Sequence, residues 1–282
     1  MRPRLGRKRT ASVPLVIVTW AIAMPGFPTG GVLLADVRVS FVDPSTRRIV
    51  KEIDGVQKVH PVASNLAIAF SGSVEAGFFI ADQLKRSLAG ISGGKAWSPA
   101  HVAMKCSRHV KPLWESLDPK IRAGGCELLL VGAFPGGDPP SAYSDAYRFR
   151  APEFELERLP RGQASSTGSG SDVEKYVEML ESFAEDHGQL SAFSLQPFPG
   201  GPAGPMSVVL GELIDENPTP GISSQLVLCT IGVAETRIFT VESLRVELTT
   251  PPLASTLEEF HKMCSTAGLP AATAIAARCL SP

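Results

Sequence analysis

Two apolar, strand-rich runs near the start of the chain constrain its fold more than any other feature. Residues 13–24 and 32–40 form these runs, and a turn rich in proline and glycine, residues 25–31, separates them. Short apolar runs bounded by turn residues predict buried strands. A proline- and glycine-rich connection between two such runs predicts a hairpin. The sequence therefore predicts a buried β-hairpin at the beginning of the fold.

The rest of the chain alternates between groups of strands and pairs of helices. Strands are expected at residues 49–53, 57–60, 66–70, 127–134, 142–150, 154–159, 225–231 and 237–241. Helices are expected at residues 74–88, 98–117, 172–185 and 206–216, with a helical tail at 256–279. Two sheets packed face to face, with a helix pair on each outer side, would bury all of these apolar faces. The expected fold class is therefore α+β, a four-layer αββα sandwich with a C-terminal helical extension.

Composition limits the kind of partner this chain can have. It has 282 residues, of which 44% are hydrophobic and 20% charged, with a net charge of −1. These values are typical of a folded globular protein and give no overall attraction for nucleic acid. Its five cysteines are dispersed without a C-x-x-C pair, and its five histidines show no metal-ligand spacing. We expect a reducing, cytoplasmic location, no cofactor, and neither a nucleic-acid nor a membrane partner.

The N-terminus allows a rival interpretation. Residues 2–9 are basic, residues 13–24 could be the apolar region of a signal peptide, and Ala21-Ile22-Ala23 resembles a cleavage site. Cleavage after Ala23 would remove a strand that the second apolar run needs as its partner, and the dispersed cysteines argue against export. The apolar run is also too short to span a bilayer.

Several polar residues stand at the ends of the expected strands, and each has an ordinary structural explanation. A threonine in a strand most often packs, a lone lysine is usually solvated, and Asp36 and Arg38 share one strand face and could form a surface pair. Residues 71–73 could cap a helix. Residues 167–171 could be a flexible loop with no role. They also lack the first glycine of a Gly-x-Ser-x-Gly nucleophile turn, which argues against Ser-His-Asp catalysis.

Taken in order, these residues resemble those of proteasome β-type subunits and bacterial proteasome-like proteases. The resemblance lies in residues 31–38, in Lys58-Val59, in residues 69–73 before a helix and in residues 167–170 before another, and it covers roughly residues 18–241. Those proteins are N-terminal nucleophile hydrolases with an αββα fold. The resemblance implies a nucleophile at Thr19, a lysine at Lys58, an aspartate that holds it at Asp36, a structural arginine at Arg38, an oxyanion-binding amide at Gly72, and a serine near the amine at Ser169. It also implies a peptide or amide substrate and a homo-oligomer.

The sequence departs from that pattern in ways that bear on activity. A threonine hydroxyl needs a base, and its own α-amine can serve only when the residue is the first of the chain. Thr19 is internal, Val18 stands where a glycine usually precedes the nucleophile, and residues 220–224 lack the aspartate that would support Ser169. Thr19 could be exposed by self-cleavage after Val18. It could also follow a start codon at position 18 and lose its methionine, the route we prefer because it explains the odd composition of residues 1–17.

Two functions are therefore expected to compete. The first is a threonine-type peptidase or amidohydrolase with a basic N-terminal extension at 1–17, a hydrolase domain at 18–250 and a helical tail at 251–282. The alternative is a catalytically inactive subunit of the same fold that acts in assembly or protein interaction. The missing aspartate and the internal position of Thr19 favour this alternative.

Overall fold

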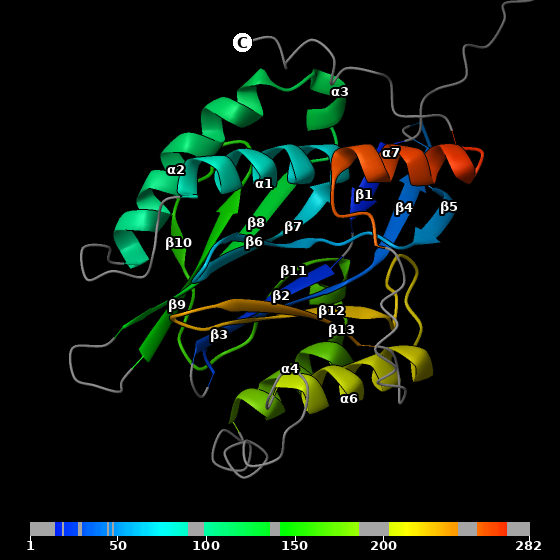
Figure 1. Ribbon diagram of the computed structural model, residues 1–282. Coiled ribbons are helices and arrows are strands. Elements are labelled where there is room, and N and C mark those ends of the chain that lie inside the picture. The colour runs from blue at the N-terminus through cyan, green and yellow to red at the C-terminus, as the bar shows by residue number, and fades with distance from the viewer. Residues whose placement is uncertain are drawn as a thin grey trace, which may run out of the picture.

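The strands form two antiparallel sheets. The computed structural model describes residues 15–18, 20–27, 30–43, 45–46, 48–89, 99–135, 142–185, 203–241 and 253–269. Sheet A has the order β10 (Glu157–Arg158), β9 (Ala142–Arg150), β8 (Cys126–Pro135), β7 (Leu66–Ser73), β1 (Leu15–Val18), β4 (Arg38–Val42) and β5 (Ile49–Asp54), with β6 (Val59–Ala63) also paired to β7. Sheet B has the order β11 (Ser165–Gly168), β2 (Trp20–Phe27), β3 (Gly30–Asp36), β12 (Leu226–Ile231) and β13 (Thr236–Val241) (Figure 1).

Helices pack on the outer side of each sheet. Those of sheet A are α1 (Val74–Leu88), α2 (Pro99–Ser116), α3 (Pro119–Arg122) and α7 (Leu257–Thr266) (Figure 1). Those of sheet B are α4 (Glu174–Glu185) and α6 (Ala203–Glu216), preceded by the short 3₁₀-helix η1 (Ser169–Asp172). The expected mixed fold of antiparallel sheets and helices is confirmed.

The predicted N-terminal hairpin is wrong in one respect, because each of its two runs is divided between the sheets. β2 pairs with β3 in sheet B, whereas β1 pairs with β4 in sheet A. Val37 breaks the second run: its N–H donates to the carbonyl of Gln225, and its own carbonyl accepts from Gly55 and Val56. These bonds take Val37 out of the ladder, so the chain leaves sheet B at Asp36 and enters sheet A at Arg38. The first run crosses between the sheets between Val18 and Trp20.

Other differences from the expected elements have local causes. The loop expected at residues 163–171 contains β11, which pairs with β2. The strand expected at 57–60 is β6, which extends through Pro61 because it pairs on one side only, with β7. Of the strand expected at 154–159 only β10 forms, since Phe154 has a φ of 52°, outside the range of a strand. Helix α1 has the predicted bounds and begins after Ser73, whose hydroxyl accepts from the amide of Ala76 at 3.3 Å.

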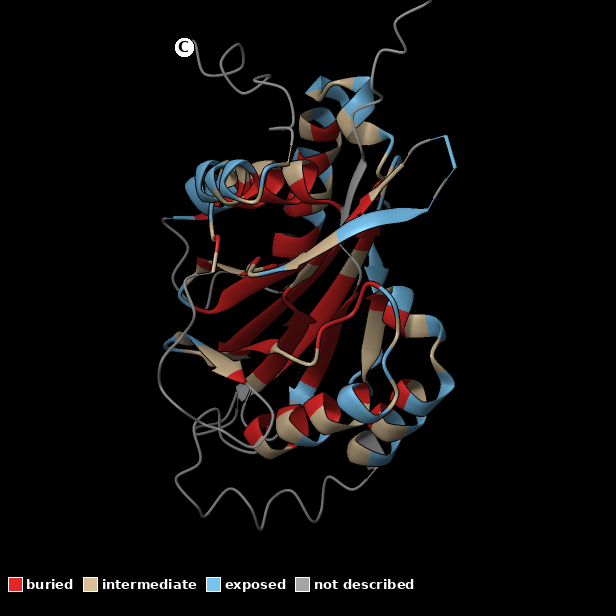
Figure 2. Cartoon of the chain, turned by 90° about the vertical axis from the view of Figure 1, so that its right-hand side faces the viewer, coloured by how far each residue is buried: buried red, intermediate tan, exposed pale blue. Residues whose placement is uncertain are grey.

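Three apolar clusters separate the layers. One lies between sheet A and its helices, one between sheet B and its helices, and the third between the two sheets. The cluster between the sheets is rich in small side chains, Ala21, Ala23, Ala35, Ala67 and Ala69. Small residues on facing strands let two sheets approach closely at native packing density. Figure 2 shows buried stretches of strand in the middle of the molecule. The strand β5, at the edge of sheet A, is largely exposed.

The imidazole of His60 makes the fold sensitive to acid. It stacks on Phe70 with ring centroids 5.6 Å apart and meets the edge of Phe78 at 5.5 Å, and its Nε2 lies 2.8 Å from the carbonyl oxygen of Gln57. Burial lowers the pKa of His60 from 6.5 to about 4. The unfolded chain takes up a proton on this residue below pH 6.5, and the folded chain resists until pH 4. The contribution of His60 to the unfolding free energy is therefore fully present above pH 6.5 and is lost as the pH falls toward 4.

We expect the wild-type protein to lose up to about 3 kcal/mol more unfolding free energy between pH 7 and pH 4 than His60→Phe, which keeps the ring stacking without a titrating group. Urea unfolding at several pH values measures the difference. Equal losses in the two proteins would show that His60 titrates normally in the fold.

Candidate functional site

The crossing between the sheets brings five strands together. Val18, at the end of β1, lies opposite Val39 of β4 and Gly72 of β7. Trp20, at the start of β2, lies opposite Gly168 of β11. Thr19, the predicted nucleophile, stands between them in the sequence and lies outside the described residues. The residues opposite its two chain neighbours, Val18 and Trp20, show which strands surround the crossing.

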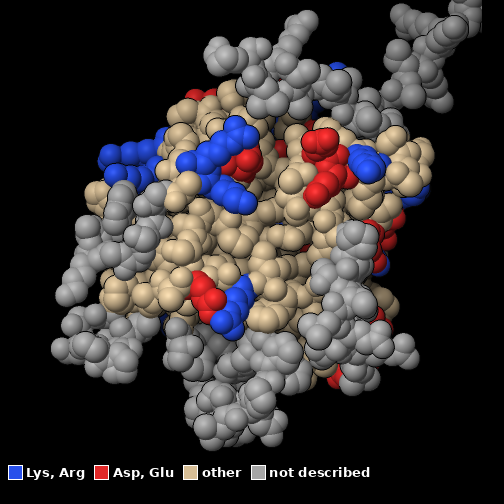
Figure 3. Space-filling model, viewed as in Figure 1, with Lys and Arg blue, Asp and Glu red and all other residues tan. Residues whose placement is uncertain are grey.

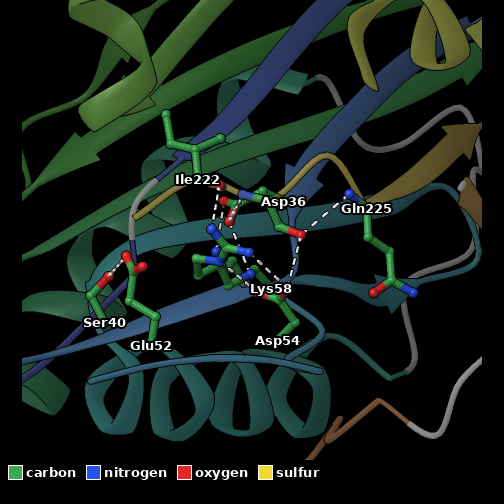
Figure 4. A network of polar contacts seen from close by, with 9 residues as sticks. Asp36, Ser40, Glu52, Asp54, Lys58, Ile222 and Gln225 are labelled. Atoms are coloured by element: carbon green, nitrogen blue, oxygen red, sulfur yellow. Dashed lines mark hydrogen bonds and ion pairs between the residues drawn. The ribbon is translucent and has the colours of Figure 1, made fainter. Parts of the chain in front are cut away.

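A buried ion pair lies next to this crossing. Asp36 ends β3, and Lys58 directly precedes β6. The Lys58 Nζ donates to Asp36 Oδ1 at 2.7 Å, and both side chains are fully shielded from solvent. The other carboxylate oxygen, Oδ2, accepts from the backbone amides of Arg38 at 2.9 Å and Ser223 at 3.4 Å (Figure 4). A buried charge requires such pairing, because an isolated one is strongly disfavoured by desolvation.

The two members of the pair titrate unlike exposed residues. Burial raises the pKa of the Asp36 carboxyl and lowers the pKa of the Lys58 ammonium, and the attraction between them opposes both shifts. A lysine whose pKa is lowered releases its proton more readily than an exposed one. Perturbed ionisable groups of this kind occur often at functional sites and also in purely structural ion pairs.

A second, more exposed ion pair lies beside the first. The Arg38 guanidinium binds Asp54 through two bonds, Nε to Oδ1 at 2.7 Å and Nη2 to Oδ2 at 2.9 Å, and its Nη1 donates to the carbonyl of Ile222 at 3.0 Å. The Ser223 hydroxyl donates to Asp54 Oδ2 at 3.3 Å. The loop between α6 and β12 is thereby held against the ends of β3 and β5 (Figure 4). A guanidinium and a carboxylate joined by two hydrogen bonds hold each other in a defined orientation, so the Arg38–Asp54 pair fixes the position of the Asp36–Lys58 pair.

Gly72 has a backbone that other residues rarely adopt. Its φ is +92°, and a Cβ at this position would lie 2.7 Å from the carbonyl oxygen of Gly125. β7 pairs with β8 on one side and with the end of β1 on the other, so Gly72 lies beside the crossing. Glycine permits both this φ and a close approach of another backbone. Its position suits an amide that faces a bound carbonyl group.

The predicted site residues are only partly brought together. Asp36, Arg38 and Lys58 form one hydrogen-bonded network, and Gly72 lies on the strand beside β1. Ser169, the first residue of η1, is exposed at the surface. The turn before it places Gly170 against the Trp20 indole, with no room for a side chain. Among the described residues, no hydrogen bond links the Ser169 hydroxyl to the ion pair, so its role stays a prediction.

Four further residues belong to this region and received no role of their own from the sequence, although three of them lie within the segments 69–73, 167–170 and 220–224. Asp54 and Ser223 complete the network around the ion pair. Ser71 and Thr167 form a buried hydroxyl pair, Oγ to Oγ1 at 2.9 Å, between β7 and β11. Asp54 had a weak signal, an acidic residue closing a strand before Gly55. Ser223 had no such signal, because it lies in the loop between α6 and β12, about 170 residues after Asp54 in the sequence.

Among the described residues, no group of three or more His, Cys, Asp or Glu side chains is placed to hold a metal ion. No helix in the described part of the chain is long and apolar enough to cross a membrane. On the face seen in Figure 3, acidic and basic side chains lie next to one another, in agreement with the net charge of −1.

Comparisons with known proteins separate fold from family. No family model matches the chain, and no curated protein matches it. The family assignment expected from the short motifs is therefore wrong: motifs of a few residues resemble those of proteasome β-type subunits, but the sequence as a whole does not match a family. Motifs this short recur by chance, and a shared fold does not carry a shared activity.

Among solved structures, the chain is similar to Anbu (ancestral beta-subunit) from Yersinia bercovieri. The TM-score is 0.52 at 12% sequence identity, over 80% of this chain and 89% of that one. At this identity the likeness concerns the fold alone. The chain thus has a mixed fold of antiparallel sheets and helices like that of the Anbu subunit, and its chemistry must be argued from its own residues.

Proposed function

We propose that this chain is a threonine-type amidohydrolase whose nucleophile is Thr19 once Thr19 is the first residue of the chain. In this proposal the layers form one four-layer αββα sandwich that carries the site at one end. One observation supports it most: β1 ends at Val18 in a slot between β4 and β7, beside the buried ion pair of Lys58 and Asp36.

The residues around the crossing supply the groups that the reaction needs. A free α-amine titrates near about pH 8 and can accept the proton of its own hydroxyl. The hydroxyl oxygen then attacks the substrate carbonyl, the proton passes to the departing amine, and water later hydrolyses the resulting ester. The positive charge of Lys58 lowers the pKa of a neighbouring amine, and Asp36 holds Lys58 in place. The Gly72 amide would donate to the developing oxyanion, an interaction worth about 3 kcal/mol in comparable sites.

The pairing of β1 indicates the substrate class. Residues 15–18 lie opposite residues 39–42 of β4, and the last two also lie opposite Ser73 and Gly72 of β7. An extended peptide that replaced β1 would form the same backbone ladder on both sides, a common mode of peptide binding. Opposite residues of a ladder share a face, so its residue opposite Val39 would face the apolar cluster that contains Val39 and Phe78. We propose an extended peptide with an apolar residue before the cleaved bond.

The same strand supports a second candidate function. While β1 fills the slot, no peptide can pair with β4 and β7 there. A chain that never loses residues 1–18 would be an inactive subunit acting in assembly or protein interaction. Self-association and action in the cytoplasm are part of either proposal.

Intact mass and peptide hydrolysis, measured on the same purified sample, test the proposal. We expect a chain that begins at Thr19 to hydrolyse fluorogenic peptide amides with an apolar residue before the reporter. A chain that still carries Val18 and hydrolyses the same peptides at the same rate would exclude an N-terminal nucleophile at Thr19. A chain that begins at Thr19 and hydrolyses none of them would support the inactive subunit.

A further inference from the structure

The segment that carries α7, residues 253–269, is attached to sheet A near both of its ends. Near its start, the Ala254 amide donates to the carbonyl of Gly55 at 2.7 Å. Near its end, the Lys51 ammonium donates to the carbonyl of Ala267 at 2.8 Å. Both attachments lie in β5 or directly after it, and β5 is the edge strand next to β4. Helix α7 therefore has a fixed place on the helix side of sheet A.

Helix α7 also packs against α1. Its two inward-facing residues, Phe260 and Cys264, are one turn apart and are both fully buried. The ring centroid of Phe260 lies 6.2 Å from that of Phe78 on α1, and the Nε2 of His261 lies 3.6 Å from Glu75 Oε1. Helix α1 in turn contacts β7 and β1. The two helices thus meet over the part of sheet A that contains β1 and β4, as Figure 1 shows.

A side chain of a peptide bound in place of β1 would point toward this meeting of the two helices. In the proposed function, the residue before the cleaved bond lies opposite Val39 of β4, and opposite residues of a ladder share a face. Val39 belongs to the apolar cluster on the helix side of sheet A, together with Phe78 and Phe260. All three residues are 3% exposed or less. The peptide side chain would therefore enter a closed apolar layer, bounded by Phe78 on α1 and by Phe260 on α7.

We infer that Phe260 determines the size of the side chain accepted before the cleaved bond. This inference rests on the proposed function and narrows its apolar substrate residue to a small or medium one. Interiors are close-packed, so a larger side chain enters only where another gives way. The residue of β1 at the position opposite Val39 is Val18, a medium-sized residue type. A peptide with valine at this position matches that strand, whereas phenylalanine requires the ring of Phe260 to be displaced.

Two fluorogenic peptide amides that differ only in the residue before the reporter, valine or phenylalanine, test the inference. For the wild-type protein we expect kcat/KM to be about tenfold or more higher for the valine peptide, because a single methylene in an apolar pocket already changes kcat/KM by about tenfold. Phe260→Ala should raise kcat/KM for the phenylalanine peptide and lower the valine-to-phenylalanine ratio by about tenfold or more. Phe260→Leu, with an intermediate volume, should give an intermediate ratio.

Phe134→Ala is the matched control. Phe134 is another buried phenylalanine of the same apolar cluster, but it lies at the end of β8 remote from Gly72 and packs against Tyr143, with ring centroids 6.2 Å apart. Its substitution should lower the melting temperature, as Phe260→Ala does, and leave the valine-to-phenylalanine ratio unchanged. A thermal melt verifies the fold of every variant, and Phe260→Leu carries the test if Phe260→Ala does not fold.

The outcomes distinguish this inference from the proposed function. A wild-type ratio in folded Phe260→Ala, or a wild-type protein that prefers the phenylalanine peptide, would overturn the inference alone. An equal change of the ratio in Phe134→Ala would also overturn it, since selectivity would then follow a general loosening of the apolar cluster. Absence of hydrolysis of both peptides by the wild-type protein would overturn the proposed function and this inference with it.

Discussion

Thr19→Ala is expected to abolish peptide hydrolysis, with a loss of kcat of about a thousandfold or more, because removal of a nucleophile leaves only the binding and oxyanion groups. The folded structure should survive. Thr19→Ser keeps a hydroxyl group and is the matched control, and it should retain hydrolysis. Progress curves with fluorogenic peptide amides measure both proteins, and intact mass identifies the first residue of each chain.

The Thr19→Ala variant tests two things separately: how residues 1–18 are removed, and whether Thr19 is the nucleophile. If residues 1–18 are removed by self-cleavage, Thr19→Ala should also retain them, and its mass should exceed that of Thr19→Ser by the mass of those residues. Full hydrolysis by Thr19→Ala would reject Thr19 as the nucleophile whatever the state of the N-terminus.

Breaking the buried ion pair is expected to have the second large effect. Lys58→Met leaves the Asp36 carboxylate buried without its cation, and Asp36→Leu leaves the Lys58 ammonium without its anion. Each single substitution should lower the unfolding free energy by about 3–5 kcal/mol. The double substitution removes both charges and should recover most of that loss. All three variants should lack hydrolytic activity, because each loses either Lys58, the cation beside the proposed nucleophile, or Asp36, which holds Lys58 in place.

Urea unfolding of the four proteins forms a double-mutant cycle that isolates the coupling between Lys58 and Asp36. The exposed pair of Arg86 and Asp82, 2.8 Å apart on α1, supplies a control cycle with an expected coupling below about 1 kcal/mol. A coupling for Lys58 and Asp36 as small as that of the control would show that the pair is solvated in solution. Retained hydrolysis in a folded Lys58→Met protein would remove Lys58 from the proposed chemistry.

Local pattern predicted the elements whose burial repeats along the chain. The apolar face of residues 74–88 and the polar residue before it predicted α1 with the bounds that the structure has. The alternation in residues 142–150 predicted β9 in the same way. One neighbouring layer covers one face of α1, so the periodicity of its sequence records the burial directly. β9 is covered on both faces, by α2 and by β2, and its alternating side chains still predicted a strand.

Pattern failed where long-range backbone bonds decide the strand ends. Nothing in residues 32–40 marks Val37 as a break, because its hydrogen bonds go to Gln225, Gly55 and Val56. The serines, threonine and glycine of β11 are typical of turns and predict a loop, but these residues form a strand because they pair with β2.

The sequence by itself determined which residue types could act: a threonine in a strand, an aspartate at the end of the next run, a lysine before another strand and a glycine before a helix. Only the tertiary structure decided which of them meet. It brought Asp36 and Lys58 into a fully shielded pair and added Asp54 and Ser223 around it. It left Ser169 exposed and placed the hydroxyls of Ser71 and Thr167 in contact. The physical reason is that periodicity reports which side of an element is buried, whereas the partner across a layer is set by strand register between segments far apart in the chain.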